Sequence, residues 1–599
     1  MSNIYKLFDE VIQQVNNSIK TYPQKLSTEV IEQLTINLGY ERCYYYASLT
    51  DAMNDINAEP KILTTLTDPK VMVQFDYDGT PIVVLLDDCE ESGIITIPRS
   101  AKLFLNTYEL SINGGHLAVT EGHDLTIFGG SEDNKGRIIT TPQEGKVGGV
   151  VNFKGRNLAC YNTYFEVSTT HSKAVYALYI SKFDKADIIN CDINASYSAP
   201  PNGSYYSSGI HTGKCGSPFN VIGCNINCFS DGMPMYGILS NDGNTSVIDD
   251  CDINVQVTSQ HVAIGVVNQS GSMCNINNSI ISAVTNSKDT SYRQCVGVLN
   301  EGNLVMDGCE CELTVDGHYA HAVENYINSN AVLRNCNLKV TIVSETGAIS
   351  VKAVVNLSHL ECYDSVFWTD ARYGNNGKPM AIAVFNQADA YLSNCTVTGT
   401  HSGLQHSGKS LYIDGGMYTG TWHGGVYIAT DPDSVTHINN AVLRDGHYDG
   451  QFEDPEQTLN VWYYWGAIYI GGSNGRSDIV ANLDGCTFEG FKHAICMRGS
   501  LGEMNNTAKL SNCTFAPRGN SSKLCTINYH RSSHHVHVGV GCNITEEEIF
   551  HESTDAYTKE EFIPNDEMLV FTNDIYRGIY NGREMNDTDA VALSSLLEA

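Results

Sequence analysis

The sequence is short of basic residues and of long apolar runs. It holds 36 Lys and Arg against 68 Asp and Glu in 599 residues, which gives a formal net charge of -32. This charge argues against binding to nucleic acid or to anionic membrane surfaces. An apolar run of 18 residues, as a membrane-spanning helix needs, is absent from the sequence. We therefore expect neither a nucleic acid partner nor insertion into a membrane.

Two further signals are missing. The first residues, Met1 to Lys6, lack the apolar core of a secretory signal peptide. A Cys-x-x-Cys pair is also missing, although the chain has 20 cysteines. We therefore expect synthesis in a cytoplasm, exit by a route other than a signal peptide, and no cofactor.

A short phrase built around cysteine recurs along most of the chain. It consists of Asn, Asp or Gly, then Cys, a polar residue and, in most copies, an apolar one. Cysteine occupies it at positions 191, 224, 251, 309, 336, 395, 486 and 513. Copies without cysteine fill the gaps at Asn278, Asp364, Gly416 and Asn440, and the adjacent cysteine copies are 27 or 33 residues apart. Self-similarity at this period predicts a solenoid.

A second phrase runs in step with the first and ends in Ser240, Asn268, Asn300, Asn325, Asn356 and Asn386. Both phrases are rich in β-branched residues and alternate apolar with polar residues, which is the period of a β-strand. A coil of about 27 residues has room for two or three short strands, and stacked coils let each strand pair in parallel with its copies. The sequence therefore predicts an all-β parallel β-helix with an internal cysteine column. It also predicts a column of asparagines whose amides stack from coil to coil.

The repeat decides how the cysteines are interpreted. Because a small apolar side chain suits an internal column, we favour reduced core cysteines over disulfides or metal ligands. His535 and His537 place two imidazoles on one face of a strand-like run and are a weak candidate for a metal site. Our main expectation is therefore that the protein binds no metal.

The solenoid is expected over residues 81–545. We expect it to be preceded by an N-terminal helix for oligomerisation or attachment, residues 1–24, and by an α+β adaptor, residues 25–80. Residues 4–19 predict an amphipathic helix. This helix packs either on its own chain or in a bundle between identical chains, and we favour the bundle, as a homotrimer. Ser48 predicts the start of a short helix that follows a strand at residues 42–46.

Residues 546–599 form a separate C-terminal segment that we expect to include a small cap. Its residues 579–597 are similar to half of a dockerin. Ile579 and Arg583 stand where calcium-binding loops carry acids, so we expect no calcium here. A helix from Ala590 to Leu597 is expected either to cap the solenoid or to join a partner.

The short capped helix, the segment Ile94-Ile95-Thr96-Ile97-Pro98 and the long Asn-Cys coils together resemble a known superfamily. They look like the pectate-lyase-like right-handed parallel β-helix proteins, in particular the tailspike and tail-fibre proteins of bacteriophages. The likeness covers residues 40–545 and is architectural. It implies a right-handed helix and a homotrimer in the phage tail. It also implies attachment to tail or baseplate proteins, and binding to a bacterial surface glycan.

Histidines recur in the later coils at a nearly constant distance after the cysteine phrase. They are His401, His423, His447 and His493, and Asp370 stands at the corresponding place one coil earlier. A stack of this kind stabilises turns, binds sugar or binds metal, and we favour the first. Side chains on adjacent coils lie about 5 Å apart, near the carboxylate separation of retaining glycosidases. The weak catalytic candidates are Asp370, Asp431, Asp433, Glu453 and Asp454.

All four tryptophans lie in or near the same region as these histidines. A face of aromatic rings beside carboxylates and amides is typical of sugar-binding sites, because one side of a pyranose is apolar. A contact between subunits is the alternative. The candidate carbohydrate-binding residues are Trp368, Trp422, His423, Tyr427, His447, Trp462 and Trp465.

Three hypotheses for function follow. The favoured one is a phage tail fibre or tailspike, located in the virion, that adheres to bacterial surface carbohydrate. The second is a polysaccharide depolymerase, either a glycoside hydrolase or a lyase, on the same scaffold. The third is a structural or adhesive solenoid without glycan chemistry.

Overall fold

A computed structural model of the chain contains two compact units, residues 1–289 with 294–304 and residues 290–293 with 305–599. The structure describes residues 44–56, 68–76, 78–170, 173–198, 206–241, 243–258, 261–285, 295–315, 319–343, 350–371, 381–420, 424–446, 466–472, 478–489, 493–499, 506–516, 527–530, 535–543, 569–571, 579–580 and 583–584. The expected helix at 4–19 and the expected helix at 590–597 lie outside these ranges. Among the described residues, the structure contains no helix with the length and apolar character needed to cross a bilayer.

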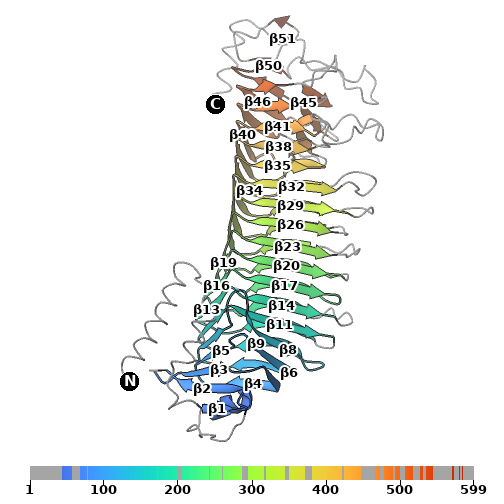
Figure 1. Ribbon diagram of the computed structural model, residues 1–599. Helices are drawn as coiled ribbons and strands as arrows, with labels where there is room; N and C mark the ends of the chain where they lie inside the picture. Colours follow the sequence, from blue (N-terminus) through green and yellow to red (C-terminus); the bar gives the residue numbers. More distant parts are fainter. Residues whose placement is uncertain are drawn as a thin grey trace. The chain divides into compact units, whose positions relative to one another are not determined.

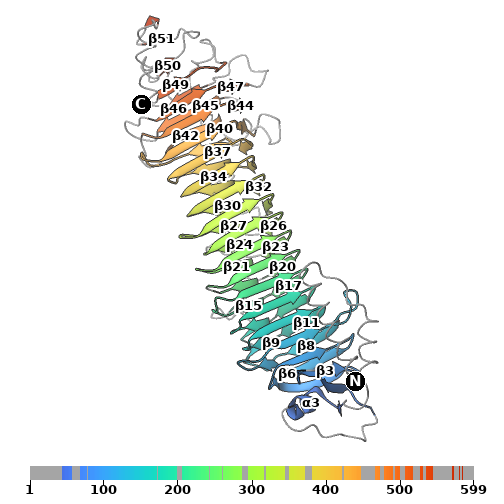
Figure 2. The same ribbon diagram turned by 90° about the vertical axis from the view of Figure 1, so that its left-hand side faces the viewer.

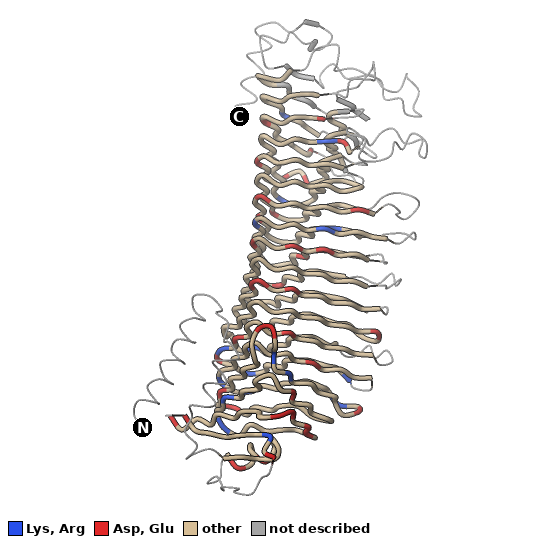
Figure 3. The backbone as a smooth tube through the Cα atoms, in the orientation of Figure 1, with Lys and Arg blue, Asp and Glu red and all other residues tan. Residues whose placement is uncertain are grey.

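Each unit is a parallel β-solenoid, as the repeat predicts (Figures 1 and 2). A coil consists of a strand of sheet A, then a middle strand and a return strand that both belong to sheet B. Each strand pairs in parallel with its copy in the next coil, for example Asp187 with Asn220 in sheet A and Ile193 with Ile226 among the middle strands. Acidic residues are spread along the coils of both units (Figure 3).

The first unit opens with β1(Tyr44–Tyr46), α3(Leu49–Asp55) and β2(Val71–Phe75). Its sheet A strands are β3(Pro81–Leu85), β5(Ala101–Phe104), β7(Leu125–Phe128), β10(Asn157–Tyr161), β13(Lys185–Ile189), β16(Pro218–Ile222), β19(Thr245–Asp249), β22(Met273–Asn277) and the strand at the unit boundary, β25(Asn303–Asp307). Its middle strands are β4(Cys89–Ile97), β6(Glu109–Val119), β8(Gly136–Thr141), β11(Thr163–Thr169), β14(Asp192–Tyr197), β17(Asn225–Ser230), β20(Asp252–Val257) and β23(Ile280–Thr285). Its return strands are β9(Val147–Phe153), β12(Ala174–Ile180), β15(Ser207–Thr212), β18(Met235–Ser240), β21(Ala263–Asn268) and β24(Cys295–Asn300).

The second unit repeats this order. Its sheet A strands are β28(Asn330–Arg334), β31(His359–Tyr363), β34(Asp389–Ser393), β37(Ser410–Asp414), β40(Val435–Asn439), β43(Val480–Asp484), β46(Thr507–Ser511), β49(His535–Val538) and β50(Leu569–Phe571). Its middle strands are β26(Glu310–Val315), β29(Asn337–Ile342), β32(Val366–Ala371), β35(Thr396–Gly399), β38(Met417–Gly420), β41(Val442–Asp445), β44(Thr487–Glu489) and β47(Thr514–Phe515). Its return strands are β27(Tyr319–Asn325), β30(Ser350–Asn356), β33(Ala381–Asn386), β36(Ser402–His406), β39(Val426–Ile428), β42(Gly466–Gly472), β45(His493–Gly499) and β48(Ile527–His530). A short antiparallel pair, β51(Ile579–Tyr580) and β52(Arg583–Glu584), lies near the C-terminus.

The short helix predicted after Ser48 is confirmed as α3. The Ser48 hydroxyl accepts a hydrogen bond from the Asp51 N–H, as an N-cap does. Strands β1, β2 and β3 pair in antiparallel fashion beside this helix. Parallel pairing begins between β3 and β5, at Ile82 and Lys102.

The residue that precedes the cysteine position turns the chain from sheet A into the middle strand. Its φ is positive, for example 53° at Asn190, 52° at Asp250 and 51° at Asn335. Only Gly, and to a lesser degree Asn and Asp, adopt this left-handed conformation at low cost. The conformation therefore explains why the phrase begins with Asn, Asp or Gly.

We predict that Asn335→Val lowers the free energy of unfolding by about 1–2 kcal/mol, because a β-branched residue is strained in the left-handed region. Asn335→Gly is expected to change it by only a few tenths of a kcal/mol, since the amide contact that it loses, 2.8 Å to Asp307 Oδ1, is solvent-exposed. Urea unfolding of both variants provides the measurement. Equal midpoints for the two variants would contradict the conformational explanation.

The predicted internal cysteine column is confirmed. The cysteines of the phrase are free and buried in both units. Several of these thiols donate a hydrogen bond to the backbone carbonyl two residues earlier in the chain. Cys336 Sγ, for example, donates to the Arg334 carbonyl at 3.1 Å. Ser365, which takes the cysteine position one coil later, makes the same contact to Tyr363 at 2.8 Å. Burial raises the pKa of the Cys395 thiol to about 11, so it stays protonated at neutral pH.

The predicted asparagine column is also confirmed. In the first unit the Asn268 amide donates to Asn300 Oδ1 at 2.7 Å. In the second unit Asn325 donates to Asn356 at 2.8 Å and Asn356 donates to Asn386 at 2.7 Å. These side chains are fully buried. The ladder therefore supplies hydrogen bonds inside the coil where the chain turns toward sheet A.

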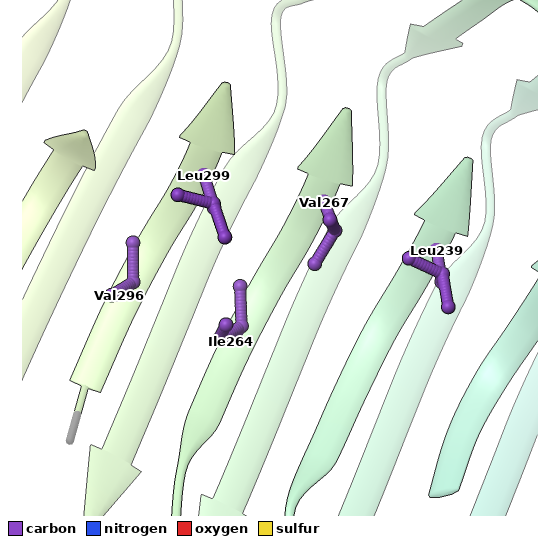
Figure 4. Packing of buried hydrophobic residues seen from close by; sticks show 5 residues of the cluster. All are labelled: Leu239, Ile264, Val267, Val296 and Leu299. Atoms are coloured by element: carbon purple, nitrogen blue, oxygen red, sulfur yellow. The ribbon is translucent and has the colours of Figure 1, made fainter. Parts of the chain in front are cut away.

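The return strands are buried on both faces, unlike the middle strands. In the first unit β21 and β24 are buried along their whole length. Together with Leu239 of β18, their outward side chains Ile264, Val267, Val296 and Leu299 form an apolar cluster (Figure 4). The sequence of a strand that is buried on both faces is a nearly continuous run of apolar residues. Any charged residue at these outward positions therefore marks a local exception.

Candidate functional site

The outward surface of sheet A in the second unit carries a row of aromatic rings. In β31 the side chains of Leu360 and Cys362 are buried, so His359, Glu361 and Tyr363 face outward by the two-residue period of a strand. The same alternation places further rings outward on the next three strands. We define the tyrosine face as Glu361, Tyr363, Tyr391, Tyr412 and His437.

Strand register brings these side chains next to one another. Tyr391 pairs with Glu361 on one side and with Tyr412 on the other, and Tyr412 pairs with His437. The Tyr412 and His437 rings stack with centroids 5.4 Å apart and an interplanar angle of 7°. The Tyr363 and Tyr391 centroids are 5.7 Å apart. Tyr412 is 43% exposed, so part of this aromatic surface is open to solvent.

A carboxylate lies among the rings. Tyr363 Oη donates to Glu361 Oε2 at 2.9 Å, and His359 Nε2 lies 3.2 Å from Glu361 Oε1. The hydrogen bond from Tyr363, followed by that from His359, lowers the pKa of Glu361. The guanidinium of Arg334 lies over the Tyr363 ring, 5.7 Å from its centroid. The face thus combines flat apolar surface with an ionised acceptor and a cationic donor.

Trp368 lies elsewhere, on the outward side of middle strand β32, where it is partly exposed. Register places it beside Lys339, which pairs in turn with Glu312. The Lys339 ammonium is 5.4 Å from the Trp368 ring centroid and 2.8 Å from Glu312 Oε1. This is a second aromatic surface on sheet B, formed by three consecutive coils.

The remaining candidate carbohydrate-binding residues do not add to the Trp368 surface within the described ranges. Tyr427 lies on return strand β39 and is only 8% exposed. Its ring packs edge-on against Tyr469 at 5.0 Å, in a cluster with Ala429 and Cys496. The following candidates lie outside the described residues: Trp422, His423, His447, Trp462 and Trp465.

The structure corrects the register of the histidine stack. Thr369 pairs with Gly399, so Asp370 is level with Thr400 rather than with His401. The sequence count took Asp364 as the cysteine position, whereas Asp364 is the left-handed residue before it. Met417 pairs with Thr396, so Gly416 itself holds the cysteine position. His401 is buried at the corner into β36, with its Nδ1 3.2 Å from Ser402 Oγ.

The weak catalytic and metal candidates are scattered over several elements. Asp370 is partly exposed on β32, and Asp431 and Asp433 are exposed between β39 and β40. His535 and His537 lie on β49, in register with Thr507 and Lys509. Glu453 and Asp454 lie outside the described residues, and of His493 only the backbone position on β45 is described.

The tyrosine face was not found from the sequence, although a signal for it exists. Glu361, Tyr391, Tyr412 and His437 each stand three residues before a residue of positive φ, namely Asp364, Asn394, Gly415 and Asn440. Counting back from that corner aligns the outward side chains of sheet A. The alignment of the coils that gave the histidine stack counted residues forward from the cysteine position instead, toward the loops where insertions occur.

Comparison with protein-family models, curated proteins and solved structures finds no match for this chain. The functional argument therefore rests on the chemistry of these surfaces.

Proposed function

We propose that this protein is an adhesin that binds bacterial surface polysaccharide along the tyrosine face. The observation that carries the proposal is the row of side chains in register on four consecutive coils, with Glu361 among the rings. Aromatic surfaces contact the apolar side of a sugar ring, and adjacent polar groups bind its hydroxyls. A repeating surface suits a repeating polymer.

The biological setting that we propose is the tail of a bacteriophage, as a tail fibre or tailspike. This part rests on the resemblance of the Asn-Cys coils to that group of proteins. It includes a homotrimer attached to tail or baseplate proteins in the virion. A mass of 65.6 kDa for the particle in light scattering, that of one chain, would contradict the trimer.

The alternative is a depolymerase that cleaves the same polysaccharide. Its support is the number of outward carboxylates near the aromatic surfaces, among them Glu361 and Asp370. Incubation with purified capsular or wall polysaccharide distinguishes the two, because an adhesin leaves chain length unchanged and a depolymerase shortens it. A protein that binds none of the polysaccharides of its host would instead be structural.

We predict that Tyr412→Ala weakens polysaccharide binding about tenfold, the effect of losing about 1.4 kcal/mol of contact at an exposed ring. Tyr412→Phe keeps the ring and is the matched control, expected to bind within about twofold of the parent protein. Binding is measured on immobilised polysaccharide. If Trp368→Ala weakens binding and Tyr412→Ala does not, the glycan binds the Trp368 surface on sheet B, and the assignment of the binding site to the tyrosine face is wrong.

A further inference from the structure

A group of polar side chains interrupts the apolar return strands of the second unit. Glu324 on β27 pairs with Val355 and Val355 with Phe385, so Glu324 stands in an otherwise apolar column. His321 and Lys352, which pair with each other, occupy the neighbouring column ahead of Ile382. His321 is 9% exposed and Glu324 is 4% exposed. Burying such groups costs free energy unless they are paired.

These side chains form a continuous hydrogen-bond chain with Ser350, the first residue of β30. Lys352 Nζ donates to Ser350 Oγ. Ser350 Oγ lies 3.0 Å from His321 Nε2, and His321 Nδ1 lies 3.2 Å from Glu324 Oε2. Because the ammonium occupies a lone pair of Oγ, the hydroxyl proton is left to point at Nε2. The Nδ1–H of His321 then donates to Glu324, which fixes the tautomer.

The order of groups is that of a nucleophile, its base and a carboxylate that orients the base. Ser350 is 9% exposed, as His321 is, and Glu324 is the most buried of the three at 4%. Lys352 lies against the Phe385 ring, 5.0 Å from the centroid, which limits water on that side. A fixed ammonium in such surroundings stabilises negative charge better than it would in water.

We propose that Ser350 is the nucleophile of an esterase site, with His321 as general base, Glu324 as the residue that positions His321, and Lys352 as the group that stabilises the oxyanion. The substrates are carboxylic esters with a short acyl chain, because so little of Ser350 is accessible. This activity is separate from polysaccharide binding on the tyrosine face and does not depend on it.

The reaction balances with water as the only co-substrate. Ser350 Oγ attacks the carbonyl carbon of the ester while its proton moves to His321 Nε2. The bond to the alcohol breaks, and the alcohol leaves with that proton. Water then attacks the acyl-serine, giving its proton to Nε2, and the acid is released as Oγ recovers the proton. The net change is ester and water to acid and alcohol.

The test uses the full-length protein with p-nitrophenyl acetate and with a fluorophosphonate that phosphonylates activated serines. We expect hydrolysis by the parent protein, and a loss of at least about 1,000-fold in Ser350→Ala. Ser402→Ala removes another buried serine that contacts a histidine and should leave the rate unchanged. Mass spectrometry should place the phosphonyl group on the peptide containing Ser350, a readout that needs no variant to fold.

The pH profile provides a second readout. Burial lowers the pKa of Lys352 to about 8, and Glu324 partly opposes this. Lys352 faces His321 and Glu324 from β27 and the apolar Ile382 and Phe385 from β33. The rate should therefore fall as pH rises through about 8 and the ammonium is lost. An unlabelled Ser350, or hydrolysis equal in the parent protein and Ser350→Ala, would overturn the proposal and leave the group as a structural one.

Discussion

Replacing Asn356 by leucine is expected to lower the free energy of unfolding by about 3–5 kcal/mol. The Asn356 amide donates to Asn386 Oδ1 at 2.7 Å, to the Asp389 carbonyl at 2.9 Å and to the Ser358 carbonyl at 3.1 Å. Its oxygen accepts from Asn325 Nδ2 at 2.8 Å and from the Ser358 N–H at 3.2 Å. Leucine has a similar volume but satisfies none of these groups, and each buried group left unpaired costs about 1–3 kcal/mol. Partial rearrangement keeps the total below the full sum.

The measurement is the urea midpoint of the second unit, followed by circular dichroism. Asn337→Leu is the matched control, because Asn337 lies on the same unit, is exposed and should change stability by less than about 0.5 kcal/mol. If the two variants unfold at the same urea concentration, the asparagine ladder contributes nothing particular to the solenoid.

The inside of the coil could be predicted from the sequence because packing constrains it in every repeat. The cysteine position tolerates only a small side chain, and the asparagine position must continue a buried ladder. The same residue types therefore recur at both positions in the sequence. Substitutes obey the same limits: His406 replaces asparagine at the end of the ladder, where its Nδ1 accepts from Asn386 at 2.9 Å. Burial lowers the pKa of His406 to about 4, so it serves as a neutral acceptor there.

The outside could not be predicted in the same way, because no packing requirement repeats there. One column of the tyrosine face runs Glu361, Tyr391, Tyr412 and His437, so no single residue type recurs in every coil. The register error at Asp364 arose because Asp364 is the corner residue of positive φ, and the cysteine position one residue later is held by Ser365. A register shift of one residue is enough to exchange the inward and outward positions of a strand.

The polar group around His321 had a signal that was overlooked. The phrase that ends in Asn325 places Glu324 where other copies have Leu239, Val267, Leu299, Val355 and Phe385. An acid in a position that is otherwise apolar is an exception that stability alone does not explain. The sequence showed the exception, and the strand register was needed to bring His321, Ser350 and Lys352 to it.

Glu324→Leu is expected to lower the free energy of unfolding at pH 7 by about 3 kcal/mol, because it leaves the buried Lys352 ammonium without its carboxylate. The triple change His321→Val, Glu324→Leu and Lys352→Ile should instead match the parent protein or exceed it by about 1–4 kcal/mol. The side chains it introduces are those of the apolar columns in the first unit, such as Val296, Leu299 and Ile264. Urea unfolding of both variants is the measurement.

The pH dependence separates this effect from a general packing change. The folded pKa of Lys352 is lowered from 10.5 to about 8, so between these values the unfolded chain binds more protons than the folded one. This contribution to stability therefore rises with pH from about 8 to 10.5, and the triple variant should lack it. A triple variant that is as unstable as Glu324→Leu would mean that the polar group holds the coils together. A stable triple variant without esterase activity would show that the fold does not need these residues and that their arrangement serves chemistry at Ser350.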